Sequence, residues 1–158
     1  MKTLSNTILI ELVFLTLTAM FLTSCSSSKS NITSDSNINY PKDLIIEIGS
    51  GGGFTGKWAG YSLLDNGKII SWNGNKQGAN PKDYQKLDQK TIQFIWQKII
   101  DSKVLDIKLQ EPGNMSKSIK IMANGKLYFF VWDYSRKDNI TNDLNILYQF
   151  IFNTLEKK

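Results

Sequence analysis

Hydrophobic residues recur at helical spacing in two parts of the chain. Residues 92–100 carry one apolar stripe, and Asp88 stands before them as a candidate N-cap. Residues 144–155 carry a second stripe behind Thr141, another candidate cap. The pattern predicts two amphipathic helices, whose expected buried positions are Ile92, Ile95, Trp96, Ile99 and Ile100 in the first and Leu144, Leu147, Tyr148, Ile151 and Leu155 in the second.

Two Asn-Gly pairs predict hairpins. Asn66-Gly67 and Asn124-Gly125 each lie between hydrophobic runs, and both residue types tolerate the positive φ angles of a type I′ turn. Residues 44–48 add a strand in front of them. The order strand, hairpin, helix, hairpin, helix predicts a single α+β domain over residues 41–158. We expect an antiparallel sheet of about five strands with two helices packed on it.

The strand predicted at residues 126–132 is apolar on both sides. One interpretation is a central strand, buried under helices on one face and under a loop on the other. The other interpretation is an open sheet face on which Tyr128, Phe130 and Trp132 form an aromatic surface. Residues 73–87 form the longest segment without predicted structure. They are the candidate cover for the sheet, and such long loops are often functional.

The N-terminal segment has the features of a bacterial lipoprotein signal peptide. A basic start is followed by an apolar run over residues 12–22, and Leu22-Thr23-Ser24-Cys25 resembles a lipobox. This resemblance implies cleavage before Cys25 and a diacylglycerol on its sulfur, so residues 1–24 are expected to be the signal peptide. The apolar run is shorter than the roughly 20 residues of a membrane-spanning helix.

Residues 25–40 comprise the cysteine and a polar stretch without helical or strand periodicity. Such a composition predicts a flexible tether. Ser26, directly after Cys25, resembles the residue choice that sorts lipoproteins to the outer membrane. The sequence therefore predicts a cell-envelope protein, anchored to the membrane through the lipid on Cys25 and facing the periplasm from the outer membrane.

Composition excludes several classes of chemistry. The 158 residues include no histidine and a single cysteine, which removes the commonest general base and any internal disulfide. No acidic cluster has the spacing of a calcium loop. Asp133, Arg136 and Asp138 are close in sequence, and we interpret them as a surface turn with a local ion pair. We expect no enzymatic activity, no cofactor and no metal.

The net charge of +5 lies on residues 41–158, because residues 1–24 and 25–40 are each neutral. The lysines are scattered, and Arg136 is the only arginine. Binding to nucleic acid would require these cations to cluster. Nucleic acid is therefore not expected as a partner.

The glycine-rich segment at residues 49–58 partly satisfies two nucleotide-binding motifs. It matches most of a Walker A loop and also spells Gly51-x-Gly53-x-x-Gly56. Both motifs require a helix after the loop, whereas a predicted strand follows here, so neither nucleotide site is expected. Glycines also allow positive φ angles and expose the backbone, which suits a platform for a protein or an extended peptide.

Phe54 in this segment is either an anchor in the core or an exposed contact. With the second interpretation, the segment and a nearby tryptophan form the candidate partner-binding site. The candidate residues are Gly52, Gly53, Phe54, Thr55, Gly56, Trp58 and Trp72.

The pentapeptide at residues 52–56 follows the first predicted strand, and the element order continues over residues 43–156. In both respects the chain is similar to emfourin-type inhibitors of thermolysin-like metalloproteases, although the lipid anchor sets it apart from them. The resemblance implies a related fold and binding to an envelope protease. The expected protein is a monomeric, non-enzymatic lipoprotein that binds a protein and is a candidate protease inhibitor. The alternative is a structural or assembly lipoprotein that binds a small ligand, glycan or envelope component through an aromatic sheet face.

Overall fold

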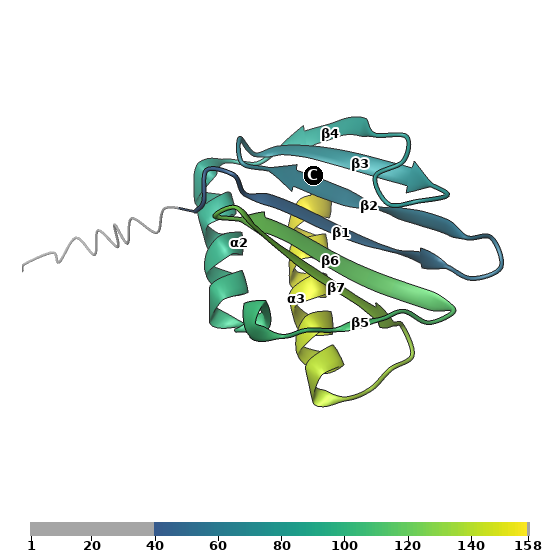
Figure 1. Cartoon of the computed structure of the whole chain (residues 1–158). Helices are drawn as coiled ribbons and strands as arrows, with labels where there is room; N and C mark the ends of the chain where they lie inside the picture. Colours follow the sequence, from purple (N-terminus) through teal and green to yellow (C-terminus); the bar gives the residue numbers. More distant parts are fainter. Residues whose placement is uncertain (1–39, 158) are drawn as a thin grey trace, which may run out of the picture. The chain divides into compact units, whose positions relative to one another are not determined.

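The computed structural model describes residues 40–157. The predicted signal peptide, Cys25 and the tether up to residue 39 lie outside the described residues. Within this range, seven strands and two α-helices form an α+β domain (Figure 1). The elements are β1 (Ile45–Gly52), β2 (Lys57–Leu64), β3 (Lys68–Gly74), β4 (Lys82–Lys86), α2 (Gln89–Asp101), the 3-10 turn η2 (Val104–Asp106), β5 (Gln110–Glu111), β6 (Met115–Ala123), β7 (Lys126–Asp133) and α3 (Asn139–Glu156).

The sheet has the strand order β4-β3-β2-β1-β6-β7-β5. All neighbouring strands are antiparallel except β5, which pairs parallel with β7. The α+β class and the predicted element order are confirmed. The sheet is mixed, however, and has two more strands than the expected five, because short polar edge strands flank the hairpins.

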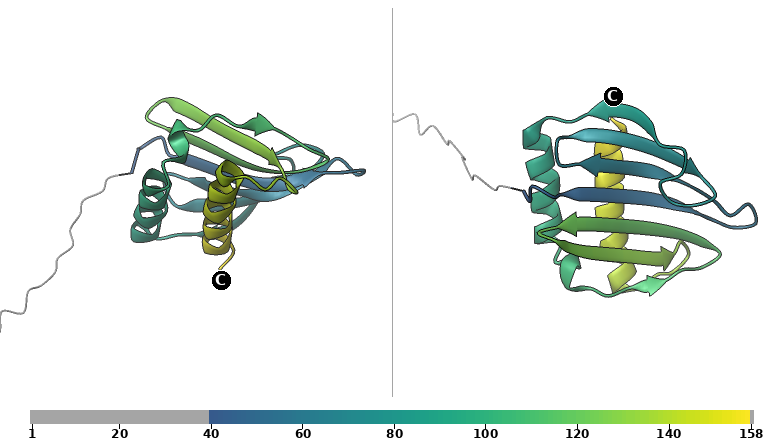
Figure 2. Two further views of the ribbon diagram at one scale, coloured as in Figure 1. Left: turned by 90° about the horizontal axis from the view of Figure 1, so that it is seen from below. Right: turned by 45° about the horizontal axis from the view of Figure 1, so that its top comes forward.

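Both helices cover the same face of the sheet (Figure 2). Their apolar stripes bury Ile92, Ile95, Trp96 and Ile99 from α2 and Leu144, Leu147, Tyr148, Ile151 and Leu155 from α3. These side chains meet Ile46 and Ile48 of β1 in one core. Ile100 is the exception among the predicted positions, since it is 44% exposed. The helix periodicity is otherwise confirmed.

The helix caps agree with the sequence at one helix and differ at the other. The Asp88 side chain accepts from the Thr91 amide at 2.8 Å and caps α2 as predicted. In α3 the N-cap is Asp138, and the prediction of Thr141 was wrong. The carboxylate of Asp138 accepts from the Thr141 amide, while the Thr141 hydroxyl accepts from the Asp138 amide. This reciprocal capping box places the threonine inside the helix.

The two Asn-Gly turns differ in conformation. Asn124 and Gly125 have φ angles of 53° and 70°, as a type I′ turn requires. Asp43 stabilises this turn by accepting from both of their amides. In the other hairpin only Gly67 has a positive φ, and Gly67 donates to the Leu64 carbonyl. The type I′ prediction was wrong there, because the loop contains an additional residue.

Two expectations about the sheet require correction. Residues 73–87 are not structureless, because β4 lies within them as an edge strand. β7 is not central, since only the two-residue β5 lies beyond it. Phe130 and Trp132 belong to the buried core under the helices, and Tyr128 packs against that core. The second interpretation, an aromatic surface of these three residues on an open sheet face, was therefore wrong.

Candidate functional site

The β1–β2 hairpin ends in a tip built by glycines. Gly52, Gly53 and Gly56 have φ angles of 103°, 67° and 59°, a region that favours glycine over other residues. The Gly56 amide donates to the Gly53 carbonyl at 3.1 Å and closes the turn. The Gly53 amide donates to the carbonyl of Asn114 in the β5–β6 loop at 2.5 Å. The tip is thereby held against a neighbouring loop.

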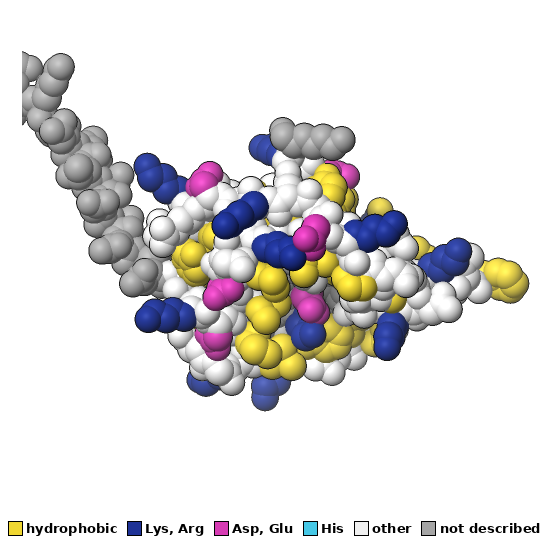
Figure 3. Space-filling model, turned by 90° about the horizontal axis from the view of Figure 1, so that it is seen from above, with side chains coloured by type: hydrophobic (Ala, Val, Ile, Leu, Met, Phe, Trp, Pro, Cys, Tyr) yellow, Lys and Arg dark blue, Asp and Glu magenta, His cyan; other side chains and the backbone are white. Residues whose placement is uncertain are grey.

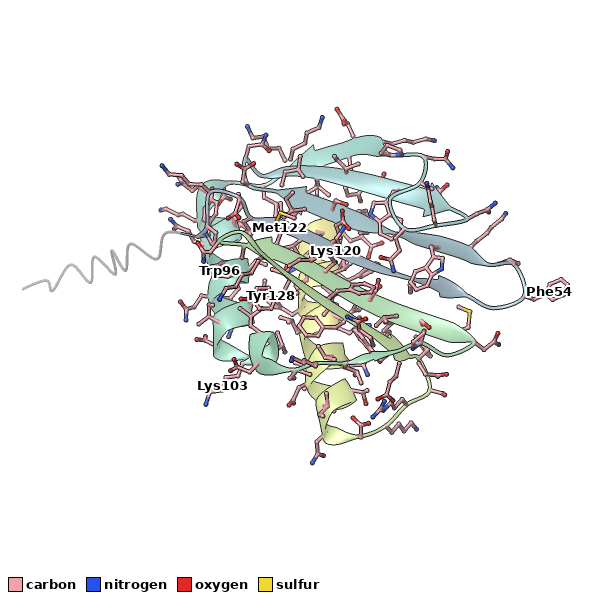
Figure 4. The ribbon with its side chains drawn as sticks, in the orientation of Figure 1. Phe54, Trp96, Lys103, Lys120, Met122 and Tyr128 are labelled. Carbon is pink, nitrogen blue, oxygen red and sulfur yellow. The ribbon has the colours of Figure 1, made fainter. Side chains whose placement is uncertain are left out.

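Phe54 projects from this tip into solvent (Figure 4). Its relative exposure of 106% is that of a side chain without neighbours. Thr55 and Gly56 are exposed beside it. The interpretation of Phe54 as an anchor in the core was wrong, because the hairpin extends past the part of the sheet that the helices cover (Figure 1).

Two further apolar side chains lie near the base of the tip. Met115 is 46% exposed, and a Cβ placed on Gly53 would lie 2.9 Å from its sulfur. Trp58 is half-buried opposite Gly51 in the β1–β2 ladder. Both residues line a pocket of about 530 Å³ that reaches the β3–β4 loop. The sequence pattern did not indicate Met115, since nothing local links it to the glycine segment.

Trp72 lies inside the structure and does not belong to the exposed site. It is only 3% exposed, and its Nε1 donates to the Ser62 hydroxyl at 3.1 Å. Gly49 and Gly60 face each other across β1 and β2, and a Cβ on Gly60 would lie 2.6 Å from Trp72 Cζ2. The two glycines therefore make room for the indole on the helix-free face. The expectation that Trp72 contacts a partner was wrong.

The β3–β4 loop covers part of the same face. Gln77 Nε2 donates to the hydroxyl of Ser118 on β6 at 2.9 Å, so the loop reaches across the strands between them. Ala79 lies against Gly74. The loop therefore covers the sheet near Trp72, as the sequence suggested for residues 73–87, although part of that segment is strand.

Lys117 is a buried cation that sequence reasoning did not single out. It is 8% exposed, and its ammonium donates to Asn145 Oδ1 at 2.8 Å. The same nitrogen lies 4.7 Å from the ring centroid of Tyr134 and 5.1 Å from that of Tyr148. Burial lowers the pKa of Lys117, because a charged ammonium loses hydration there. Lys117 lies opposite Ser50 in the ladder, so it lies between the helix-covered core and the tip.

Asp133, Arg136 and Asp138 form the local ion-pair turn that the sequence predicted. Arg136 pairs with Asp138 and with Glu111. The pKa of Asp138 is lowered, first by the Thr141 amide and then by the Arg136 guanidinium. The pKa of Asp133 is lowered by hydrogen bonds from the Ser135 hydroxyl and amide. These contacts order the loop before α3.

Several negative findings apply to residues 40–157. No group of three or more metal-ligating side chains comes together there, and no described helix combines the length and apolarity needed to cross a bilayer. β2, not a helix, follows the glycine tip. Lysines and acidic side chains are interspersed on the side seen in Figure 3.

No model of a known protein family matches the sequence, and no curated protein is significantly similar to it.

Proposed function

We propose that this chain is a lipid-anchored envelope protein whose domain binds a protein partner through the tip of the β1–β2 hairpin. The observation that carries the proposal is the fully exposed Phe54 on a turn fixed by three positive-φ glycines. A solvated aromatic side chain gains free energy when a partner buries it, because that removes a large apolar surface from water. Single aromatic anchors of this kind often dominate binding energy.

The tip is also well prepared for binding. The hydrogen bond from Gly53 to Asn114 and the internal turn bond of Gly56 fix its backbone before a partner arrives. A preorganised loop loses less conformational entropy on binding than a free one. Met115 and Trp58 offer further apolar contact area at its base. The binding surface that we propose comprises Phe54, the neighbouring backbone and these two side chains.

An envelope metalloprotease of the thermolysin type is the partner that we favour. The pentapeptide that resembles emfourin-type inhibitors, residues 52–56, lies at the exposed tip of the hairpin. A projecting loop of this kind suits insertion into an enzyme cleft. The domain would then act as an inhibitor and contribute no catalytic group of its own.

The anchor that we propose at Cys25 is compatible with the position of the tip. Asp43 contacts the β6–β7 turn, so the described chain begins at one end of β1. Phe54 follows the other end of that strand. The tether would leave the domain at the end opposite the binding tip, which would remain accessible to partners.

The structure gives little support to the second function, a ligand site on an aromatic sheet face. Phe130 and Trp132 face the helices, and Trp72 is covered on the other side. We therefore propose no small-molecule ligand.

The test is an inhibition assay. The chain from Ser26 onward is titrated against several thermolysin-like proteases, alongside Phe54→Ala and the control Ile146→Ala, a residue that is 63% exposed on α3. We expect wild type and the control to inhibit, and Phe54→Ala to be weaker by about tenfold or more. Absence of inhibition by wild type across all the enzymes would rule out the protease partner. Affinity capture from envelope extracts with wild type and Phe54→Ala then tests the tip as a general protein-binding site.

A further inference from the structure

The two edges of the sheet are protected to different degrees. β4 is short, and its pairing with β3 shifts register between Ile69 and Ile70. Its exposed positions include Lys82, Asp83 and Lys86, and the side of the molecule along which β4 runs carries interspersed lysines and acids (Figure 3). Charges and irregular pairing of this kind prevent another strand from adding to a sheet edge.

The β7 edge lacks this protection over its first half. β5 pairs with β7 only at Val131 and Trp132, and the Val131 amide donates to the Leu109 carbonyl. Backbone groups alternate in direction along a strand, so the amides and carbonyls of Phe129 and Leu127 point to the same outer side. Within residues 40–157, no backbone hydrogen bond reaches them from that side.

A slot runs beside these unpaired groups. Its volume is about 510 Å³, and it is lined by residues 127–130 of β7 and by the segment 105–110 that precedes and enters β5. Leu105 and Ile107 are half-buried apolar side chains of that segment. Leu127 is 57% exposed. The slot therefore combines free backbone donors and acceptors with apolar walls on both sides.

We propose that this slot binds an extended peptide segment of a partner protein, which adds to β7 as an additional strand. The unpaired backbone groups favour a strand over a helix or a lipid surface, because only an extended backbone presents donors and acceptors at matching spacing. The segment 105–110 lines the far side of the slot, so a single strand is a more suitable occupant than the edge of a whole sheet. Apolar walls select apolar side chains on the peptide, and the nearby Lys108 and Lys126 favour acidic residues at its ends.

The test uses full-length protein in mild detergent and a defined peptide. The probe is a capped peptide of alternating valine and threonine with a glutamate at each end, and fluorescence anisotropy follows its binding. Two versions carry N-methyl groups, one on the valine amides and one on the threonine amides. Because alternate amides of a strand point to opposite sides, we expect one version to bind about tenfold more weakly and the other to be nearly unaffected.

Two variants and an exchange measurement complete the design. Leu127→Glu replaces an apolar side chain of the slot by a charge that repels the glutamates of the probe, and it should weaken binding by about tenfold. The control Ile146→Glu puts the same change on an exposed apolar residue of α3 and should bind as wild type. The amides of Leu127 and Phe129 should exchange rapidly in the free protein and slowly with the peptide bound.

Three results would overturn the proposal. They are absence of saturable binding, equal effects of the two methylated peptides, and unchanged binding by Leu127→Glu. A concentration-dependent dimer that Leu127→Glu abolishes would assign the edge to a second copy of the chain instead. None of these results depends on whether Phe54 binds a partner.

Discussion

The glycine-rich part of the hairpin contains two kinds of glycine. Gly49 and Gly51 lie within β1, and a side chain there would collide with Trp72 or with Trp58 and its backbone. Gly52, Gly53 and Gly56 have positive φ angles and shape the tip. The first kind provides space under tryptophans, and the second kind provides backbone conformation. One run of glycines therefore serves packing at its start and presentation of Phe54 at its end.

This difference predicts how the free energy of unfolding responds to mutation along the hairpin. Changes on the packed side should destabilise the domain strongly. Changes at the tip should affect stability less and should act mainly on binding.

The largest effect is expected from Trp72→Ala. The indole is almost fully buried between Gly49 and Gly60 of the sheet and the β3–β4 loop. Its removal leaves a cavity and takes away the hydrogen bond to the Ser62 hydroxyl. We expect a loss of about 3–5 kcal/mol in the free energy of unfolding. Urea denaturation measures this loss. A loss below about 1 kcal/mol would mean that the helix-free face is loosely packed. The distinction between packing glycines and tip glycines would then not hold.

The second largest effect is expected from Gly49→Ala, which tests whether the space at Gly49 and Gly60 is needed for the Trp72 ring. Gly49 does not have a positive φ, so the cost arises from contacts of the new methyl group. A Cβ there would lie 2.3 Å from the Trp72 ring and 3.0 Å from the Ala59 carbonyl oxygen. We expect about 1–3 kcal/mol of destabilisation from overpacking. Combining it with Trp72→Leu should give a smaller loss than the sum of the two single losses, because the smaller side chain vacates that space. Strict additivity in denaturation experiments would contradict direct contact.

Much of the fold could be predicted from local sequence pattern, and the packed tryptophan could not. The stripe from Ile92 to Ile99 and the Asn124-Gly125 turn depend on neighbours in the chain, so periodicity and turn chemistry are sufficient. The burial of Trp72 depends on Gly49 and Gly60, which meet only through the register between β1 and β2. A glycine inside a strand pattern does indicate a close approach, but it does not identify the approaching side chain.

The candidate site was also predictable only where it depends on local sequence. The glycines at positions 52, 53 and 56 indicate a turn with positive φ angles, whereas the hydrogen bond from Gly53 to Asn114 that holds the tip depends on a distant part of the chain. Whether Phe54 is exposed depended on how far the helices extend over the sheet. β4 was missed because an edge strand with mostly exposed positions has no hydrophobic alternation.

A third prediction concerns Lys117, where the packed region ends. Its pKa is lowered in the folded state, so the unfolded state binds the proton more tightly. The free energy of unfolding should therefore rise as the pH increases toward the ordinary pKa of lysine, because the buried lysine is neutral there. At lower pH the lysine is charged in both states, and the full penalty of burying the charge lowers stability.

The variant Lys117→Met removes this titration. The stability of wild type relative to the variant should increase as the pH rises toward 10.5, the ordinary pKa of lysine, by less than the effect of Gly49→Ala. Tyr61 and Tyr148 have raised pKa values and remain in both proteins, so the difference between the two isolates the lysine. A difference that does not vary with pH, measured by urea denaturation, would show that the ammonium is well hydrated.

The fourth prediction moves to the tip. Gly52 has a φ of 103°, and a Cβ there would also approach the Asn114 carbonyl at 2.5 Å. We expect Gly52→Ala to cost about 1 kcal/mol. Gly56→Ala is the matched control, since its φ is 59° and nothing lies within 4 Å of the new methyl group. We expect Gly56→Ala to lose less stability than Gly52→Ala. Equal losses in the free energy of unfolding, measured by thermal and urea unfolding, would show that the contact with Asn114 contributes nothing.

The smallest effect on stability and the largest effect on binding are expected from Phe54→Ala. The side chain has no neighbours to lose, so the free energy of unfolding should change by less than about 0.5 kcal/mol. A buried phenylalanine would instead cost about 3–5 kcal/mol, and urea denaturation separates these values easily. Unchanged stability together with lost protease inhibition would place the function at the tip. Strong destabilisation would mean that Phe54 packs against the domain in solution, and the distinction between packed glycines and a presenting tip would no longer hold.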